Sequence, residues 1–282
     1  MKNLRIAFFG TPALTTTILD ELKNNGLLPI VIISGVDVPI GRKQVITPPP
    51  AKVWALTNNI EVLQPLKLDE IFLDEFRKMN IDLSVAVAYG KIMPEILINT
   101  PRLGTINIHY SLLPKYRGAT PVEAVILAGE KITGVSIQHM RYKLDSGPII
   151  LSSETSITET ETAKELRSRL NETAKKLLIE AIDQLTKKTA IFKEQNETQA
   201  TFCKKINKEN GLVDITGDPI ENYRKFRAYY GWPGIYFFTN TEKKTRVIIK
   251  DAKLINDIFV IKRVLPEGKK EMPYETFLKS NL

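Results

Sequence analysis

Short hydrophobic runs alternate with amphipathic stretches along the N-terminal part of the chain. The run at 83–88 is apolar throughout, which is typical of a central parallel strand covered on both faces. Strands are expected at 4–9, 28–34, 61–63, 83–88 and 104–109, and helices at 13–24, 50–58 and 71–79. Strands that alternate with helices predict an α/β fold with a Rossmann-like, doubly wound and mostly parallel sheet.

The pattern changes after residue 133. Segments 134–140 and 149–154 predict antiparallel strands, with the turn Asp145-Ser146-Gly147 between them, and a long amphipathic helix follows at 160–185. Beyond a polar stretch come a short helix and three alternating segments that predict a small all-β module: 235–238, 246–250 and 258–263. We therefore expect a first domain at 1–187, a linker at 188–203 and a C-terminal domain at 204–282.

Composition narrows the class of protein. A chain of 282 residues with 43% hydrophobic residues can bury a substantial core. Its single cysteine, Cys203, excludes an intramolecular disulfide and a thiolate zinc cluster, and two histidines make a multi-histidine metal site unexpected. No signal peptide, transit peptide or membrane-spanning run is recognisable, and no association helix stands out. We expect a cytoplasmic, metal-free protein that is monomeric and does not contact membranes.

The positive charge is concentrated at the C-terminal end. Residues 204–282 hold 16 Lys and Arg against 10 Asp and Glu, so this quarter carries most of the net charge of +8. A basic segment on a nearly neutral body indicates a polyanionic partner, of which nucleic acid is the commonest. A lysine-rich surface that only aids solubility is the alternative, and composition alone does not separate the two.

Three polar residues at strand ends suggest the chemistry. Asn107 and His109 lie two apart in an expected strand, so their side chains point to the same face. Asp145 comes from a second strand-to-loop junction. An amide, an imidazole and a carboxylate that converge can hold an oxyanion and move a proton, which is acyl transfer without a covalent nucleophile. A second histidine, His139, lies in an apolar strand and is expected to be structural.

The loops that follow the expected parallel strands should border this site. Ligands of doubly wound sheets bind beyond the carboxyl ends of the strands, which here means the loops after Phe9, Ala88 and His109. The chain contains neither GxGxxG nor GxxxxGK[ST], so neither a dinucleotide nor a nucleoside triphosphate is indicated.

Five segments together resemble a known family. They are GTP at 10–12, VAYG at 87–90, NIHYSLLPKYRGATP at 107–121, TGVS at 133–136 and LDSG at 144–147. In this order and spacing they resemble the 10-formyltetrahydrofolate-dependent formyltransferases. The resemblance implies 10-formyltetrahydrofolate as co-substrate and Asn107, His109 and Asp145 as catalytic residues. It implies a folate site along two loops, formed by Ala88, Tyr89, Gly90 and Ile92 and by Ser111, Leu112, Leu113 and Pro114.

Two further features resemble the members of this family that formylate methionyl-tRNA. The first is the loop at 37–43, a Pro- and Gly-bounded excursion whose Arg42 and Lys43 suit phosphate contacts. The second is the C-terminal part, in which 200–214, 226–237 and 266–278 resemble a tRNA-binding domain with an OB-fold-like β-barrel. Lys204 and Lys205 belong to this basic part. The resemblance implies initiator methionyl-tRNA as the formyl acceptor.

Two other functions stay open from the sequence. One is a formyltransferase that acts on a nucleotide-linked amino sugar, which would share Asn107, His109 and Asp145 but would not require Arg42 or the basic C-terminal excess. The other is a catalytically silent RNA-binding module on a degenerate fold. Glu123-Ala124 stands where the family commonly has Gln-Trp, so the shape of the pocket near residue 123 is not predicted.

Overall fold

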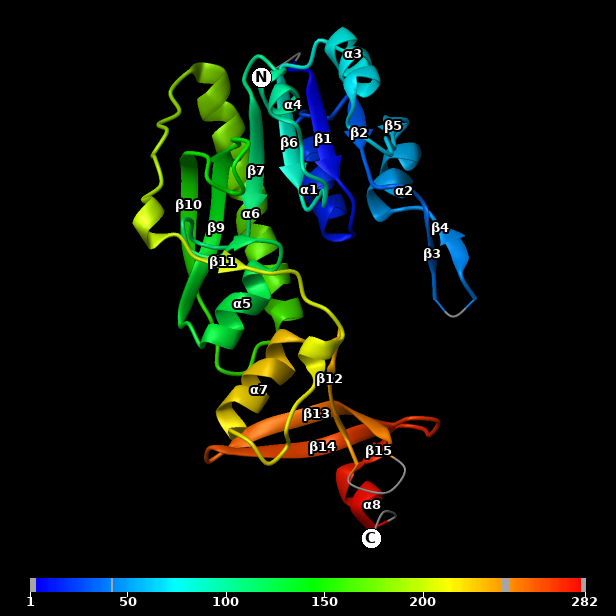
Figure 1. Ribbon diagram of the computed structural model, residues 1–282. Coiled ribbons are helices and arrows are strands. Elements are labelled where there is room, and N and C mark those ends of the chain that lie inside the picture. The colour runs from blue at the N-terminus through cyan, green and yellow to red at the C-terminus, as the bar shows by residue number, and fades with distance from the viewer. Residues whose placement is uncertain (1–3, 42, 240–243, 280–282) are drawn as a thin grey trace. The chain divides into compact units, whose positions relative to one another are not determined.

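The computed structural model describes residues 4–41, 43–239 and 244–279 (Figure 1). The chain forms two compact units, and both are discontinuous in sequence. Unit 1 comprises Met1–Ala119, Gly134–Thr155 and Ser168–Phe202, and unit 2 comprises Thr120–Thr133, Ser156–Arg167 and Cys203–Leu282. The expected domain limits at 187, 203 and 204 stay a prediction, because compactness alone does not show where an independently folding domain begins.

Unit 1 is built on a seven-stranded sheet with the order β10-β9-β7-β6-β1-β2-β5. Its strands are β1 (Ile6–Gly10), β2 (Val31–Ile33), β5 (Glu61–Leu63), β6 (Leu83–Val87), β7 (Thr105–His109), β9 (Ile132–His139) and β10 (Ile149–Ser156). The pairs β2–β5, β1–β2, β1–β6 and β6–β7 are parallel, and β9 is antiparallel to β7. The predicted Rossmann-like, mostly parallel α/β sheet is confirmed.

Helices cover both faces of this sheet. On one face Phe9 of β1 packs in a cluster with Phe76 of α3 (Glu70–Lys78) and Leu97 of α4 (Glu95–Asn99). Strand side chains alternate, so Phe8 points to the other face. There the helices are α1 (Leu14–Asn24) and α6 (Ala163–Lys187), which Asn171 joins by donating to the carbonyl of Leu14 at 3.3 Å. The apolar strands are therefore buried on both sides.

The order of the strands places the ligand edge. The chain runs from β1 outward to β2 and β5 and then returns to the other side of β1 with β6, so the winding reverses between β1 and β6. Loops that leave the carboxyl ends of strands at such a reversal diverge and leave room for a ligand. The segments after β1, β6 and β7 therefore border the candidate site.

Several short elements were not expected from the sequence. The segment expected to be a surface loop holds two antiparallel strands, β3 (Val38–Ile40) and β4 (Val45–Thr47), in which Ile40 faces Val45. Other short elements that were not predicted include α4, α5 (Pro121–Ala128), β8 (Arg117–Gly118), β11 (Phe202–Cys203) and the 3₁₀ turns Glu197–Gln199 and Glu209–Gly211. The helix α2 (Pro50–Thr57) was predicted.

Unit 2 contains a four-stranded antiparallel sheet. Its strands follow the order β12 (Ile235–Phe238), β13 (Arg246–Ile255), β14 (Ile258–Pro266) and β15 (Met272–Pro273). Asn256 and Asp257 turn the chain between β13 and β14, both with positive φ, as a tight two-residue hairpin requires. Helices α7 (Pro219–Ala228) and α8 (Tyr274–Lys279) pack on this sheet, and α5 packs on α7. The all-β module expected at the C-terminus corresponds to this sheet.

Candidate active site

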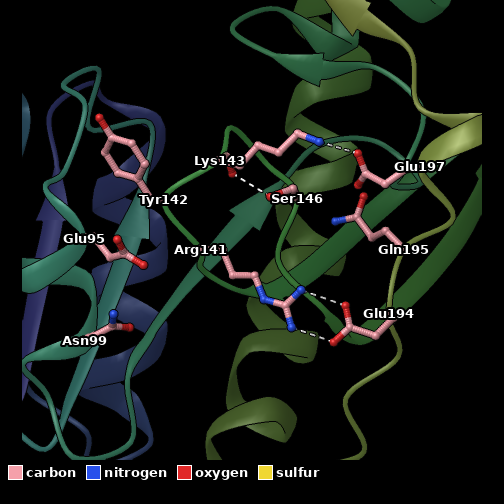
Figure 2. Close-up of a pocket in the computed structure, with 9 residues that line it drawn as sticks. All are labelled: Glu95, Asn99, Arg141, Tyr142, Lys143, Ser146, Glu194, Gln195 and Glu197. Atoms are coloured by element: carbon pink, nitrogen blue, oxygen red, sulfur yellow. Dashed lines mark hydrogen bonds and ion pairs between the residues drawn. The ribbon is translucent and has the colours of Figure 1, made fainter.

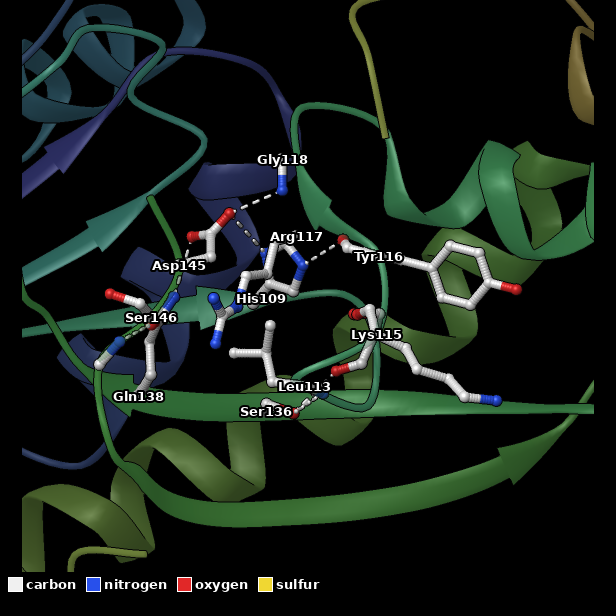
Figure 3. Close-up of polar contacts among 12 residues, drawn as sticks. His109, Leu113, Lys115, Tyr116, Arg117, Gly118, Ser136, Gln138, Asp145 and Ser146 are labelled. Carbon is white, nitrogen blue, oxygen red and sulfur yellow. Dashed lines mark hydrogen bonds and ion pairs between the residues drawn. The ribbon is translucent and has the colours of Figure 1, made fainter. Parts of the chain in front are cut away.

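Four polar side chains share one face of the sheet where β7 meets β9. Asn107 and His109 alternate along β7, and in the antiparallel register Gln138 faces Asn107 while Ser136 faces His109. Paired residues on neighbouring strands point to the same side. The chain between β9 and β10 then brings Asp145 to this group, with its Oδ2 3.7 Å from Nδ1 of His109 (Figure 3). The fold thus brings Asp145 beside His109, although the two residues are 36 positions apart in the sequence.

The hydrogen bond of His109 defines which ring nitrogen is available. Its Nε2 lies 2.8 Å from the carbonyl oxygen of Tyr116. A carbonyl oxygen only accepts, so Nε2 carries a proton and donates to it. The other nitrogen, Nδ1, faces Asp145. His109 is buried, with 5% of its surface exposed, and Nδ1 is therefore the nitrogen that can exchange a proton at the site.

Asp145 is held on both oxygens of its carboxylate. Oδ2 accepts from the main-chain N–H of Gly118 at 2.8 Å, and Oδ1 accepts from Nε2 of Gln138 at 2.9 Å. The residue adopts φ 44°, a left-handed conformation that Asp tolerates better than most residues. Each carboxylate oxygen has two lone-pair directions, so both keep one for a water molecule or a substrate amine.

Gln138 and Ser136 are site residues that the sequence analysis missed. Gln138 also accepts from the N–H of Gly147 at 3.2 Å, so one amide side chain spans the turn that carries Asp145. Ser136 accepts from the N–H of Leu113 at 3.1 Å and donates to the carbonyl of Ser111 at 2.8 Å, which fixes the loop after β7. Their signal was available, because they are the polar positions at period two in an otherwise apolar strand.

The carboxamide of Asn107 is free for a ligand. It is partly exposed, and within the described ranges of the chain it makes no hydrogen bond to protein. Buried or half-buried amides are ordinarily paired in folded proteins, so an unpaired one at a strand end is open to an incoming oxygen. Asn107 is the one member of the predicted catalytic set that has no partner in the described residues.

The loop after β6 offers its main chain rather than its side chains. Ala88 and Gly90 have positive φ of 47° and 82°, so the chain turns sharply here. Tyr89 points inward, where it meets Phe9 edge-on at 5.3 Å, and burial raises the pKa of its phenol to about 12. Ile92 is 83% exposed and presents an apolar side chain to solvent. Of the four residues predicted here for folate, Tyr89 is buried, while Ala88, Gly90 and Ile92 are exposed.

The loop after β7 is held by hydrogen bonds and is largely buried at residues 111–114. The hydroxyl of Ser111 donates a hydrogen bond to the carbonyl of Lys115 at 2.6 Å. Leu113 is buried, and Leu112 lies against Gly134, where a Cβ would meet it at 2.5 Å. Pro114 is half-buried in the same turn. The side chains of this predicted folate segment therefore mainly pack the loop.

A cavity of about 700 Å³ adjoins the segment that carries Asp145 (Figure 2). Two ion pairs line it. Arg141 donates two hydrogen bonds to Glu194, at 2.8 and 2.6 Å, and Lys143 donates to Glu197 at 2.6 Å. The cavity is lined by Glu95, Asn99, Arg141, Tyr142, Lys143, Ser146, Glu194, Gln195 and Glu197. Sequence analysis did not predict it, because the lining residues come from segments with no shared pattern.

Arg117 is fully buried, and two residues that line this cavity, Gln195 and Glu197, bind its guanidinium. Its guanidinium donates to Oε1 of Glu197 at 2.7 Å and to Oε1 of Gln195 at 2.7 and 3.1 Å. Hydrogen bonds from Arg117 and then from Lys143 lower the pKa of Glu197 to about 2. A buried guanidinium requires such a carboxylate, because an uncompensated charge away from water is costly.

Replacing Glu197 by glutamine should therefore destabilise the fold in a pH-dependent way. The pKa of this carboxyl is lower in the folded protein than its usual 4.5, so the carboxylate stabilises the fold above pH 4.5 and loses this effect as the pH falls toward 2. The difference in Tm between wild type and Glu197→Gln should be largest at neutral pH and shrink in acid. Thermal melts across this range check it, and a constant difference would contradict it.

The residues predicted to bind tRNA lie in two regions of the chain, the β3–β4 turn and the start of the C-terminal segment of unit 2. Lys43 is exposed at the turn between β3 and β4, and its neighbour Arg42 lies outside the described residues. Lys204 and Lys205 are exposed in unit 2, where the carbonyl of Lys204 accepts from the hydroxyl of Thr120 at 2.8 Å. Within the part of the chain that the structure describes, no group of three or more His, Cys, Asp or Glu could hold a metal ion, and no helix could span a membrane.

The fold and the site define a class. A Rossmann-like sheet carries Asn107 and His109 on one face, and the connection from β9 to β10 brings Asp145 beside them. A free carboxamide, a buried imidazole and an anchored carboxylate in this arrangement could stabilise an oxyanion and move a proton. Comparison with known proteins gives the family. Residues 4–182 match the model of the formyl transferase family, and the chain belongs to this family.

Relatives and solved structures agree with this assignment. The chain is 40% identical over 300 residues to the methionyl-tRNA formyltransferase of Campylobacter lari, covering 99% of this chain and 96% of that protein. The structure of methionyl-tRNA formyltransferase from Clostridium thermocellum matches with a TM-score of 0.64, 16% identity and coverage of 93% and 98%. An N-formyltransferase from Helicobacter canadensis, solved with folinic acid and dTDP-3-aminofucose, matches with a TM-score of 0.65, 18% identity and coverage of 92% and 95%.

Proposed function

We propose that this enzyme transfers the formyl group of 10-formyltetrahydrofolate to the α-amino group of initiator methionyl-tRNA. The observation that carries the proposal is the 40% identity to a methionyl-tRNA formyltransferase over nearly the whole chain, including the basic C-terminal part. The amino-sugar enzyme matches at 18% identity, which supports a shared fold only. The product would be N-formylmethionyl-tRNA, which serves translation initiation in the cytoplasm, and we expect the enzyme to act as a monomer.

The proposed reaction has three requirements. The substrate amine attacks the formyl carbon, and the carbonyl oxygen becomes an oxyanion in a tetrahedral intermediate. The bond from carbon to N10 of the folate then breaks while one proton passes from the amine to N10. The enzyme must therefore stabilise the oxyanion, accept the amine proton and supply a proton to the leaving nitrogen.

The free carboxamide of Asn107 is the oxyanion donor in this proposal. Its NH₂ has no protein partner within the described residues, so it can bind the developing charge without first breaking another hydrogen bond. Preorganised donors of this kind stabilise a transition state because they need no reorganisation during the reaction. His109 lies two residues further along the same face and adds a second polar group beside the reacting carbon.

Asp145 and His109 would handle the protons. Nδ1 of His109 faces Oδ2 of Asp145 at 3.7 Å, somewhat longer than a direct hydrogen bond. The carboxylate can take the amine proton directly or through water, since two of its lone-pair directions are unused. The imidazole can pass a proton through Nδ1, because its Nε2–H is fixed on Tyr116.

The loop after β6 and a separate cavity beside Asp145 both offer features that a folate could use. A flat pterin with donors and acceptors on its edge suits the main-chain groups of the turn at 88–90, where positive φ values expose N–H and C=O groups. Exposed Ile92 supplies an apolar wall. The cavity of about 700 Å³ beside Asp145 falls within the size of sites that bury small ligands. When bound there, the folate would supply the formyl carbon.

Direct assay tests the proposed function. Purified enzyme is incubated with labelled 10-formyltetrahydrofolate and with either methionyl-tRNA or a nucleotide-linked amino sugar, and the labelled product is identified after hydrolysis. N-formylmethionine should form only from methionyl-tRNA. Formylation of the sugar without formylation of the tRNA would reject the proposal, and turnover of neither acceptor would favour a silent RNA-binding module.

Binding of tRNA should be strongly dependent on salt. Lys43, Lys204 and Lys205 are exposed cations, and each cation that contacts a phosphate releases counterions on binding. We expect the affinity for methionyl-tRNA to fall roughly ten-fold or more between about 50 and 200 mM salt. Lys204→Gln combined with Lys205→Gln should reduce both the affinity and the salt slope. Fluorescence titration measures this, and a salt-independent Kd would argue against a phosphate-binding surface.

A further inference from the structure

We infer that Gln195 is a positioning residue for the Asp145 carboxylate, and that buried Arg117 fixes Gln195 in the orientation this requires. The inference rests on the proposed function of the Asp145 site. It concerns a residue of the expected linker, 188–203, which sequence analysis treated only as a polar connection. Gln195 reaches across 50 residues of sequence to the turn that carries Asp145.

The side chain of Gln195 hydrogen-bonds to the main chain of this turn at two points. Its Nε2 donates to the carbonyl of Asp145 at 2.8 Å and to the carbonyl of Gly147 at 2.7 Å. From the other side, Gln138 binds the carboxylate of Asp145 and the N–H of Gly147. The turn is thus held between two glutamine side chains. Because Gln195 touches only main-chain atoms of the turn, it acts on the chemistry through Asp145.

The turn needs such restraint. Asp145 adopts φ 44°, and residues other than glycine keep a left-handed conformation only where the surroundings determine it. No regular strand hydrogen bonds hold this stretch, because β9 ends at His139 and β10 begins at Ile149. Side-chain hydrogen bonds to its carbonyls replace the missing ladder. Without them, the distance from the carboxylate to His109 would not be fixed.

Arg117 determines which way the Gln195 amide points. An arginine can only donate, and its Nε and Nη2 lie 3.1 and 2.7 Å from Oε1 of Gln195. The oxygen of the amide must therefore face Arg117, and its NH₂ must face the two carbonyls of the turn. Arg117 is itself fully buried, so this orientation is set from inside the protein. Glu194, which precedes Gln195, forms an ion pair with Arg141. This pair is exposed and adds little to the restraint of the turn.

Gln195→Glu separates the two halves of this arrangement. Glutamate keeps an acceptor for Arg117 and has the same shape, but it places an oxygen where an N–H donated to two carbonyl oxygens. The fold should be retained with a modest fall in melting temperature, because the turn loses both hydrogen bonds from residue 195. The matched control is Gln199→Glu, because Gln199 lies four residues further along the same segment, is exposed, and has no side-chain hydrogen bond within the described residues.

Kinetics with methionyl-tRNA give the first test. Gln195→Glu should lower kcat roughly 10- to 100-fold, as expected when a catalytic group is displaced by a fraction of its hydrogen-bond length, with KM for both substrates nearly unchanged. Gln199→Glu should behave as wild type. Wild-type kcat in Gln195→Glu would overturn the inference, and so would a rise in KM with kcat unchanged, since that would place Gln195 in substrate binding.

A double-mutant cycle distinguishes positioning from a general structural role. If Gln195 acts through Asp145, then Gln195→Glu in an Asp145→Asn background should cause no further loss of kcat. Additive losses would overturn the inference. Hydrogen exchange over residues 144–148 provides a readout that needs no turnover, and we expect at least ten-fold faster exchange in Gln195→Glu. If wild type formylates no methionyl-tRNA, the proposed function fails, while unchanged exchange in Gln195→Glu would reject the positioning role by itself.

Discussion

Asn107→Ala is expected to lower kcat for formyl transfer by roughly 10²- to 10³-fold, the usual cost of removing one oxyanion donor. The physical reason is that the Asn107 amide is free of protein partners in the described structure and lies on the face shared by His109, Ser136 and Gln138. A donor that is already in place contributes mainly in the transition state, so KM should change much less than kcat. Steady-state and single-turnover kinetics measure both.

The fold should be unaffected by this substitution. Asn107 is partly exposed and makes no hydrogen bond that alanine would break, so we expect the free energy of unfolding to change by no more than about 0.5 kcal/mol. Asn24→Ala is a suitable control, because Asn24 is exposed at the end of α1 and its side chain makes no hydrogen bond within the described residues. Near-normal turnover of Asn107→Ala, in a protein that melts like wild type, would remove Asn107 from the proposed mechanism.

Asp145→Asn should cost a similar factor of about 10² or more in kcat, for a different reason. The substitution removes the proton acceptor and replaces one oxygen by an NH₂. Both carboxylate oxygens accept hydrogen bonds, from Gly118 and Gln138, so the new NH₂ must face a donor whichever way the amide turns. We therefore expect some loss of stability too, of about 1–3 kcal/mol for one unsatisfied group.

Asp257→Asn provides the matched control for this prediction. Asp257 also has positive φ, 59°, at the turn between β13 and β14, and asparagine tolerates this conformation equally well. Its kcat should equal that of wild type. Equal turnover of Asp145→Asn and wild type would show that this carboxylate neither accepts the proton nor orients His109.

The arrangement of the sheet and of two site residues follows from periodicity. Alternation along β7 places Asn107 and His109 on one face because strand geometry allows nothing else. The antiparallel partner strand was also recognisable, but not its register, and register decides that Gln138 and Ser136 join this face. The approach of Asp145 was predictable only from the family resemblance, because no local pattern links a turn to a strand 36 residues away.

Other features lie beyond sequence patterns for physical reasons. Gln195 and Glu197 belong to a polar stretch without periodicity, and their role depends on a buried arginine 78 and 80 residues earlier. The strands β3 and β4 carry exposed Val38, Ile40 and Val45 around Gly41 and were interpreted as a loop. A two-stranded hairpin has no buried face, so it leaves no hydrophobic alternation to detect.

The discontinuity of the two units limits how this enzyme can be dissected or recombined. Residues 120–133 and 156–167 belong to unit 2 together with 203–282, and α5 of the first segment packs on α7 of the last. A single cut anywhere in the gene therefore cannot release either unit whole. A fragment that stops at residue 203 would leave the buried side of α5, with Val125 and Ile126, without α7. Exchange of unit 2 between relatives would thus require five coordinated crossovers, at 119/120, 133/134, 155/156, 167/168 and 202/203, rather than a simple fusion.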